Sequence, residues 1–419
     1  MIIIAILLIF FFQPIKASNG LYEKLKSITG VYVKQIETLE GYKESYELAI
    51  VQPVDHNNPD GPKFTQRVFL SHKDYSKPVV FETNGYGVNW EKNLELSTML
   101  NANQIIVEHR YYDASKPKAL NWKYLTVWQA ASDHHRIINL LKNIYQGKWV
   151  STGRSKGGMA SLFLENYYPD DIDATVAFVA PIFNDIQDQR FISFLNQRAD
   201  SNQIKRLKNF QISCLEKRDS MLILINKHIH TRNIEHTLSL DSILEWSILE
   251  FPTDFWSSNL NPDNIPNKNA SCKTLFNYLN SVSNISNLGD FNIKSNYPLT
   301  WQIVTEFGYY AYDIDHLKSI LKVVKEPDKR CFAPKTNYIP EYNPDIMKDI
   351  LFNLQNNRNN IIYLYGANDT WTAGKVDPKE TTNSIQVIVE GFPHKFGIKD
   401  LPQEDINIVL KALNDWIYK

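Results

Sequence analysis

Cysteine is scarce in this chain. Only three of the 419 residues are cysteines, Cys214, Cys272 and Cys331, so at most one disulfide can form within the chain. Their spacing does not resemble a metal site, and we expect neither a metal ion nor a cofactor. All three lie in the middle third of the chain, where a bridge would tie that region together, but the sequence does not select the pair.

An excess of charge of either sign is also missing. The chain carries 45 basic and 46 acidic residues and a formal net charge of −1. It therefore lacks the basic excess by which proteins attract nucleic acid or an anionic membrane surface. Internal repeats and low-complexity linkers are absent as well. A hydrophobic content of 43% in a chain of this length instead predicts one large globular domain with an insertion, or two domains.

Long apolar runs are absent after the first residues. Residues 1–12 are apolar, but a membrane-spanning helix needs about 20 such residues. The segment that follows suits cleavage after Ala17, so we expect residues 1–17 to be a signal peptide, with a membrane anchor as the alternative. The mature protein is then predicted to be soluble and exported, whether secreted, periplasmic or lysosomal.

Strand-prone and helix-prone segments alternate in two parts of the chain. Helical periodicity at 126–145 and 159–168 separates short β-branched runs, which predicts a mostly parallel sheet covered by helices on both faces. From about 181 to 334 the sequence is helix-prone with few strand signals. The expected strands are 47–54, 63–71, 78–82, 104–109, 148–152, 174–180, 360–366 and 384–390.

One serine lies where a strand-prone segment meets a helix-prone one. Ser155 is the centre of a G-x-S-x-G pattern, with Gly153 and Gly157 on either side. Small residues at these two positions permit the sharp, strained turn that lifts a nucleophilic hydroxyl out of a sheet. The next helix then begins below the serine, and its N-terminal N–H groups stabilise negative charge there. The pattern is weak by itself and needs partners.

A serine nucleophile requires a base and an acid that orients the base. In doubly wound hydrolases these follow in the order serine, acid, histidine. His394 is the only histidine in the last hundred residues, and it follows the expected strand 384–390. Asp369 follows the preceding strand and is the leading acid, with Asp377 as the alternative. We therefore predict a Ser155–Asp369–His394 triad on an α/β-hydrolase fold.

Stabilisation of the reacting oxyanion needs two backbone N–H donors. One is expected from Lys156, the residue after the nucleophile. The other is expected from the loop after strand 78–82, where Gly85, Tyr86 and Gly87 let the backbone approach a substrate carbonyl.

Longer motifs in both the sheet and the insertion carry a family resemblance. They resemble the secreted bacterial tripeptidyl aminopeptidases, serine peptidases related to lysosomal prolylcarboxypeptidase and dipeptidyl peptidase II. The resemblance runs from about residue 40 to the C-terminus. Its motifs are 107–112 (VEHRYY), 124–130 (YLTVWQA), 148–158 (KWVSTGRSKGG), 245–256 (EWSILEFPTDFW), 301–308 (WQIVTEFG) and 365–371 (YGANDTW).

This resemblance implies an exopeptidase that releases short N-terminal peptides, often with proline before the cut bond. The family's nucleophile, acid and base fall on Ser155, Asp369 and His394. Two departures stand out: Thr370 replaces a frequent proline, and Arg154 lies in the turn, where we expect it to alter the floor of the pocket. The changes of sequence pattern at about 181 and 334 predict residues 18–180 and 335–419 as the two parts of an α/β-hydrolase domain, with 181–334 as a helical cap.

The implied substrates are peptides with a free N-terminus, so the enzyme must hold an ammonium group, for which a carboxylate is the obvious partner. Glu250 and Glu306 are the candidates in the two cap motifs. Trp256 and Trp301 lie near them and are candidates for an apolar slot around a proline ring. The alternatives are an esterase or lipase with the same triad, or a catalytically silent binding protein on the same scaffold. The oligomeric state stays open.

Overall fold

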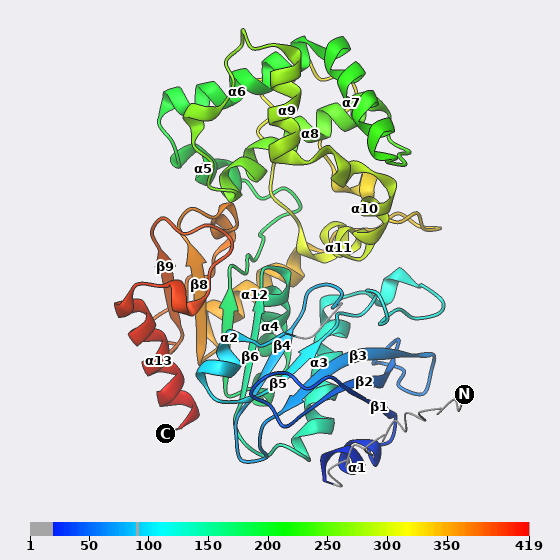
Figure 1. Cartoon of the computed structure of the whole chain (residues 1–419), viewed down its shortest axis with the longest axis vertical. Coiled ribbons are helices and arrows are strands. Elements are labelled where there is room, and N and C mark those ends of the chain that lie inside the picture. The colour runs from blue at the N-terminus through cyan, green and yellow to red at the C-terminus, as the bar shows by residue number, and fades with distance from the viewer. Residues whose placement is uncertain (1–19, 89–91, 419) are drawn as a thin grey trace, which may run out of the picture.

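A nine-stranded sheet forms the centre of one half of the molecule (Figure 1). The computed structural model describes residues 20–88 and 92–418, so the expected signal peptide lies outside the described residues. The strand order is β1-β2-β3-β5-β4-β6-β7-β8-β9. The strands are β1 (Val31–Ile36), β2 (Glu44–Pro53), β3 (Lys63–His72), β4 (Val79–Thr83), β5 (Asn103–Val107), β6 (Trp149–Arg154), β7 (Ala174–Phe178), β8 (Ile361–Gly366) and β9 (Ile385–Val389).

The sheet is antiparallel at one end and parallel over the rest. Strands β1, β2, β3 and β5 pair antiparallel, whereas β5, β4, β6, β7, β8 and β9 pair in parallel. This confirms the predicted α/β class. Strand β1 was not predicted, because it is an edge strand with only Val31 buried and therefore has little hydrophobic alternation.

Helices cover both faces of the sheet, because each face presents apolar side chains that must be buried. Leu96 of α2 and Val409 and Leu413 of α13 pack on one face. The opposite face is covered by α3, α4 and α12, whose apolar residues share clusters with the strands. The helices of this half are α1 (Leu21–Lys26), α2 (Glu95–Met99), α3 (Val127–Lys142), α4 (Lys156–Tyr167), α12 (Pro344–Asn356) and α13 (Gln403–Ile417).

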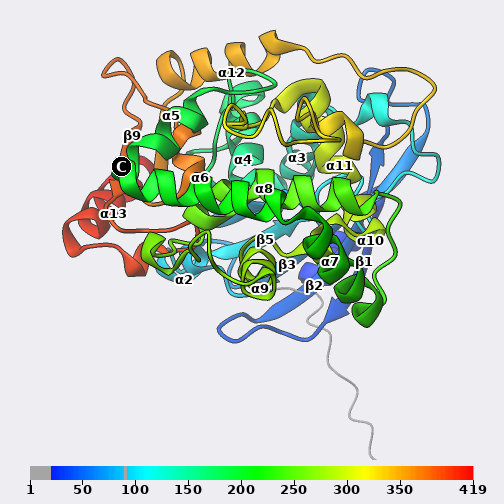
Figure 2. The same ribbon diagram turned by 90° about the horizontal axis from the view of Figure 1, so that it is seen from above.

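Seven further helices lie between β7 and β8 and form the upper half of the molecule (Figure 1). Seen from above, the longest of them, α8, extends across the molecule (Figure 2). The expected domain limits at 181 and 334 stay a prediction. These helices are α5 (Arg190–Gln197), α6 (Ser201–Glu216), α7 (Arg218–Arg232), α8 (Leu240–Ser257), α9 (Cys272–Ser283), α10 (Asp290–Ser295) and α11 (Tyr297–Gln302).

Short helical turns complete the chain. One of them, η5, is a π-helix that directly continues α11, and the others are 3₁₀ turns. They are η1 (Trp122–Tyr124), η2 (Pro169–Asp171), η3 (Pro262–Asn264), η4 (Ile285–Leu288), η5 (Ile303–Phe307), η6 (Lys329–Phe332), η7 (Thr370–Gly374) and η8 (Ile398–Asp400).

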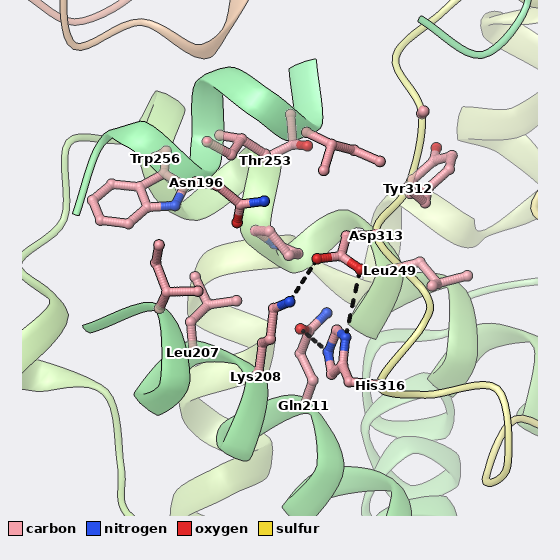
Figure 3. Close-up of a pocket in the computed structure, with 15 residues that line it drawn as sticks. Asn196, Leu207, Lys208, Gln211, Leu249, Thr253, Trp256, Tyr312, Asp313 and His316 are labelled. Carbon is pink, nitrogen blue, oxygen red and sulfur yellow. Dashed lines mark hydrogen bonds and ion pairs between the residues drawn. The ribbon is translucent and has the colours of Figure 1, made fainter. Parts of the chain in front are cut away.

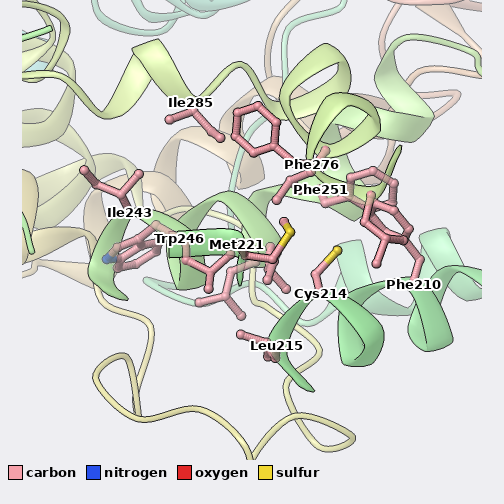
Figure 4. Packing of buried hydrophobic residues seen from close by; sticks show 14 of the residues in the cluster. Phe210, Cys214, Leu215, Met221, Ile243, Trp246, Phe251, Phe276 and Ile285 are labelled. Atoms are coloured by element: carbon pink, nitrogen blue, oxygen red, sulfur yellow. The ribbon is translucent and has the colours of Figure 1, made fainter. Parts of the chain in front are cut away.

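The inserted helices have a hydrophobic core of their own (Figure 4). Phe210, Met221 and Phe251 belong to it, and each is at most 1% exposed. Cys214 is buried in the same core, where desolvation raises the pKa of its thiol to about 12. All three cysteines are unpaired in the structure. No helix of the described residues is long and apolar enough to cross a membrane.

Candidate active site

Ser155 lies in the turn between the central strand β6 and helix α4. Its φ of +54° falls in the left-handed region that a side-chain-bearing residue rarely adopts. The N–H group of Ser155 donates to the carbonyl oxygen of Phe178 at the end of β7, with an N–O distance of 2.9 Å. This bond holds the strained turn at the carboxyl edge of the sheet, and strain of this kind is concentrated at functional sites.

The two glycines beside this turn are required by close backbone contacts. A Cβ on Gly157 would lie 2.6 Å from the carbonyl oxygen of Thr83, and one on Gly153 would lie 2.8 Å from the amide nitrogen of Gly158. The Thr83 hydroxyl at the end of β4 donates to the Gly157 carbonyl oxygen at 2.8 Å. Small residues therefore let helix α4 begin against β4, as the sequence pattern predicts.

Asp369 and His394 are brought together from loops that follow two neighbouring strands. The Nδ1 of His394 lies 2.7 Å from Oδ2 of Asp369. Asp369 is fully buried, follows β8, and accepts a second hydrogen bond from the Trp371 amide. The alternative acid, Asp377, is mostly exposed and pairs with Lys375. A carboxylate on Nδ1 orients the imidazole and leaves Nε2 for the reaction.

The loop of His394 is tied to the serine turn by Arg154. The guanidinium of Arg154 donates to the carbonyl oxygens of His394, at 3.2 Å, and of Phe396. It also lies over the Phe178 ring, 4.8 Å from the ring centroid. Among the described residues, no hydrogen bond joins Ser155 Oγ to the His394 ring, and such bonds are often long until substrate binds. The sequence indicated Arg154 only as part of a pocket floor.

The loop after β4 lies directly against the start of α4. A Cβ on Gly85 would be 2.6 Å from the Gly157 amide nitrogen, so this loop and the nucleophile turn are in backbone contact. The amide of Lys156, the first residue of α4, has no partner within its own helix. The amide of Tyr86 already donates to Asn84 Oδ1 at 3.0 Å. The expected oxyanion donors are thus adjacent, with Gly85 and Gly87 left as loop donors.

The side chain of Lys156 holds the same loop in place. Its Nζ donates to the Gly85 carbonyl oxygen at 2.5 Å and lies over the rings of Tyr86 and Tyr112, 5.3 and 4.9 Å from their centroids. Burial lowers the pKa of this amine well below its usual value. The hydrogen bond from this amine fastens the oxyanion loop to the start of α4.

The four cap residues predicted to bind substrate do not share one pocket. Glu250 lines a pocket of about 220 Å³ between α8, α10 and α11. Trp256 lies in a separate pocket of about 50 Å³ beside Lys208, Asp313 and His316 (Figure 3).

The other two predicted cap residues have structural contacts. The carboxylate of Glu306 accepts a hydrogen bond from the Val127 amide at 2.7 Å, at the N-terminus of α3. Burial raises the pKa of Glu306 to about 8. Trp301 is 3% exposed and packs against Trp122 and Tyr338. Their roles in substrate binding stay predictions.

Glu250 is surrounded by donors. Its carboxylate accepts hydrogen bonds from the hydroxyls of Tyr310 and Tyr312 and forms an ion pair with Lys329, whose Nζ lies 2.5 Å from Oε1. Asp254, one turn further along α8, lines the same pocket. The sequence motif 245–256 contained Asp254, but only the structure distinguishes it from the other acids of that helix.

Aromatic rings connect this pocket to the catalytic loops. The ring of Trp371, two residues after Asp369, lies 6.3 Å from the His394 ring and 5.9 Å from the Tyr309 ring, centroid to centroid. Tyr309 in turn lines the pocket that contains Glu250. One wall of the pocket therefore packs against a ring, Trp371, that also lies beside His394.

A strained serine between a central strand and a helix, with an aspartate–histidine pair after later strands of a doubly wound sheet, defines an α/β hydrolase. The chain belongs to the PS-10 peptidase S37 family, which it matches over residues 15–416. It is a serine peptidase, and the resemblance read from its motifs is confirmed.

Two relatives and one solved structure are similar to this chain. The chain is 30% identical over 357 residues to the prolyl tri/tetrapeptidyl aminopeptidase of Streptomyces mobaraensis, and the match covers 84% of this chain and 74% of the relative. It is also 30% identical over 121 residues to the lysosomal Pro-X carboxypeptidase of Bos taurus, covering 26% and 23% of the two chains. The proline iminopeptidase of Mycobacterium smegmatis superposes with a TM-score of 0.43 at 11% identity, covering 88% of this chain and 98% of that one.

Proposed function

We propose that this protein is an exported serine exopeptidase that removes short peptides, about three residues long, from the N-terminus of its substrates. Ser155 is the nucleophile, His394 the base and Asp369 the residue that orients the base. The observation that carries the proposal is the 2.7 Å hydrogen bond between buried Asp369 and His394, on loops tied by Arg154 to the strained Ser155 turn.

The reaction follows from these positions as an acyl transfer. Ser155 Oγ attacks the scissile carbonyl while His394 Nε2 takes its proton, and the carbonyl oxygen becomes an oxyanion. The Lys156 amide and the 85–87 loop donate hydrogen bonds to this oxyanion. His394 then returns the proton to the leaving amine as the C–N bond breaks. Water, deprotonated by His394, releases the acyl peptide from Ser155.

The cap supports recognition of the substrate N-terminus. The Streptomyces mobaraensis relative is named a prolyl tri/tetrapeptidyl aminopeptidase. Release of a fixed short length requires a group that binds the terminal ammonium at a fixed distance from the serine. Glu250 and Asp254 both line the pocket beside the aromatic rings of the catalytic loops and are the candidates for that site. Glu306 and Trp301 lie outside this pocket, and other groups already contact their side chains.

Substitution of the nucleophile and the acid tests the triad. Ser155→Ala is expected to abolish hydrolysis of a fluorogenic tripeptide and labelling by a fluorophosphonate while thermal unfolding is unchanged. Asp369→Asn is expected to lower kcat by about 10⁴, because the imidazole is then held in the wrong tautomer. Asp377→Asn, at the exposed alternative acid, is the matched control and should retain full activity. Activity in Ser155→Ala, or equal losses at Asp369 and Asp377, would refute the assignment.

The esterase alternative is tested on paired substrates. A serine exopeptidase that acts from the N-terminus should cleave a free tripeptide amide far better than the same peptide with an acetylated amine. An esterase should instead prefer short acyl esters and ignore the amine. Export is tested separately, by N-terminal sequencing of the protein secreted by its own cells, which should begin after Ala17.

A further inference from the structure

The pocket that contains Glu250 carries an unbalanced negative charge. Glu250 and Asp254 both line it, whereas Lys329 supplies one positive charge. Lys329 lies 2.5 Å from Glu250, so that pair is neutral as a unit. No lysine or arginine in the described part of the chain forms an ion pair with Asp254. With Asp254 ionised, the pocket has a net charge of about −1, which is complementary to one ammonium group.

One hydroxyl beside Asp254, that of Ser283, is only weakly bonded. Ser283 of α9 is 6% exposed and lines the pocket. It lies close enough to Asp254 to lower the pKa of that carboxyl, yet its hydroxyl makes no hydrogen bond of normal geometry within the described residues. A bound –NH₃⁺ group has three donors, and it would satisfy both the carboxylate and the hydroxyl.

The distance from this pocket to the catalytic centre suits a short peptide. The centroid separations of 6.3 Å from His394 to Trp371 and 5.9 Å from Trp371 to Tyr309 place the Tyr309 ring no more than about 12 Å from the imidazole. An extended chain spans at most about 3.3–3.6 Å per residue, so about three residues cover such a distance. The pocket wall formed by Tyr309 therefore lies within reach of a bound peptide of about three to four residues.

We propose that Asp254 is the residue that binds the α-ammonium group of the substrate, while the Glu250–Lys329 pair forms the wall beside it. This inference rests on the proposed exopeptidase function and names the group that sets its substrate class, peptides with a free amine about three residues before the cut bond. Glu250 is then a positioning residue, because its charge is already matched and its oxygens are already bonded.

The proposal predicts a pH dependence of binding. The titratable and charged groups that face Asp254 are Glu250 on its own helix and Lys329, Tyr309 and Tyr310 from the segments packed against it. Burial and the charge of Glu250 raise the pKa of Asp254 to about 7. The ammonium site needs Asp254 ionised, and the substrate amine, with a pKa of about 8, must be protonated. KM for a free-amine peptide should therefore be lowest between about pH 7 and 8 and rise below pH 7.

The test is a cycle of two enzymes and two substrates. Wild type and Asp254→Asn are assayed on a fluorogenic tripeptide with a free amine and on its N-acetylated twin. We expect the variant to lose about 10- to 100-fold in kcat/KM on the free peptide, through KM, and to be unchanged on the acetylated one. In the variant, KM should no longer increase as the pH falls below 7, while the pH profile of kcat should match that of wild type. Asp263→Asn, at an exposed cap aspartate, is the matched control.

The outcomes separate this inference from the proposed function. An equal loss on both substrates, or an unchanged KM in Asp254→Asn, overturns the ammonium site while leaving the peptidase intact. A wild-type enzyme that cleaves both substrates equally, or that Ser155→Ala does not inactivate, overturns the exopeptidase function itself. Should Asp254→Asn fail to fold, Asp254→Ser is used in the same cycle with the same expected loss.

Discussion

Arg154 joins the two halves of the catalytic site at the level of a single residue. Its planar guanidinium donates to two carbonyl oxygens of the His394 loop while its face lies on the Phe178 ring. The ammonium group of a lysine is a compact charge without the planar, forked donors of a guanidinium, so it cannot bond both carbonyl oxygens and stack on the ring at the same time. The side chain therefore sets where the imidazole sits relative to Ser155.

Replacing this arginine should affect the chemical step more than binding. Arg154→Lys is expected to lower kcat about tenfold and to leave KM within about twofold, because the base is displaced while the substrate pocket is intact. The measurement is steady-state kinetics on the free tripeptide. Arg136→Lys, on α3, is the control and should keep both constants. A change confined to KM would show that Arg154 acts on the substrate and not on the base.

The N-terminus of α3 illustrates how one element depends on a distant side chain. Thr126 accepts from the Gln129 amide as the N-cap, and Glu306 of η5 accepts from the Val127 amide at 2.7 Å. The first amides of a helix need such partners because they have none within the helix. Glu306 thereby fastens the π-helix of the cap to a helix that covers the sheet.

This contact gives a prediction about stability and its pH dependence. Glu306→Ala leaves the Val127 amide unsatisfied and should cost about 1–3 kcal/mol of unfolding free energy, whereas Glu306→Gln keeps an acceptor and should be tolerated. Folding raises the pKa of Glu306 to about 8, so between about pH 5 and 8 the folded protein keeps a proton that the unfolded chain has lost. The stability of wild type therefore falls as the pH rises through this range. The Gln variant does not titrate.

Thermal unfolding at several pH values checks both parts. As the pH rises from 5 to 9, the melting temperature of Glu306→Gln should increase relative to that of wild type. The melting temperature of Glu306→Ala should be below that of wild type at every pH. Neither variant should alter the preference for free over acetylated peptides. A loss of that preference in Glu306→Gln would instead assign Glu306 to substrate binding.

At the scale of the whole molecule, the cap contacts the catalytic loops directly. Arg198 at the end of α5 donates to the Ala367 carbonyl oxygen at 2.8 Å, two residues before Asp369, and its guanidinium lies over Trp256. The Thr370 hydroxyl donates to the Thr253 carbonyl oxygen of α8 at 3.4 Å. The position of the cap and the position of the acid are therefore coupled.

Breaking the arginine contact should slow catalysis on every substrate. Arg198→Met keeps the apolar stem but removes the donor to the Asp369 loop, and we expect kcat/KM to fall about tenfold on both a peptide and a small acyl ester. Arg206→Met, which removes a similar bond to the Ile265 carbonyl oxygen elsewhere in the cap, is the control and should have little effect. A loss restricted to the peptide would mean that Arg198 contacts substrate and does not act through Asp369.

Much of the sheet and the order of the catalytic residues could be predicted from the sequence. Short β-branched runs separated by helical periodicity identify the strands from β2 onward, and the glycines around Ser155 mark the strained turn. Strand β1 was missed because an edge strand has one weakly buried face. The choice of Asp369 over Asp377 was made from position alone, and the structure adds burial and a hydrogen bond to His394.

By itself the sequence determined which residues come to the carboxyl edge of the sheet, because parallel strands all end at that edge and the chain order assigns Ser155, Asp369 and His394 to successive loops. Only the tertiary structure decided what the cap acids contact. Glu250, Asp254 and Glu306 are chemically alike in sequence, yet helix packing puts the first in an ion pair with Lys329, the second in the same pocket with no ion pair of its own among the described residues, and the third against the start of α3. Charge balance in the folded cap, which no local pattern encodes, separates their surroundings.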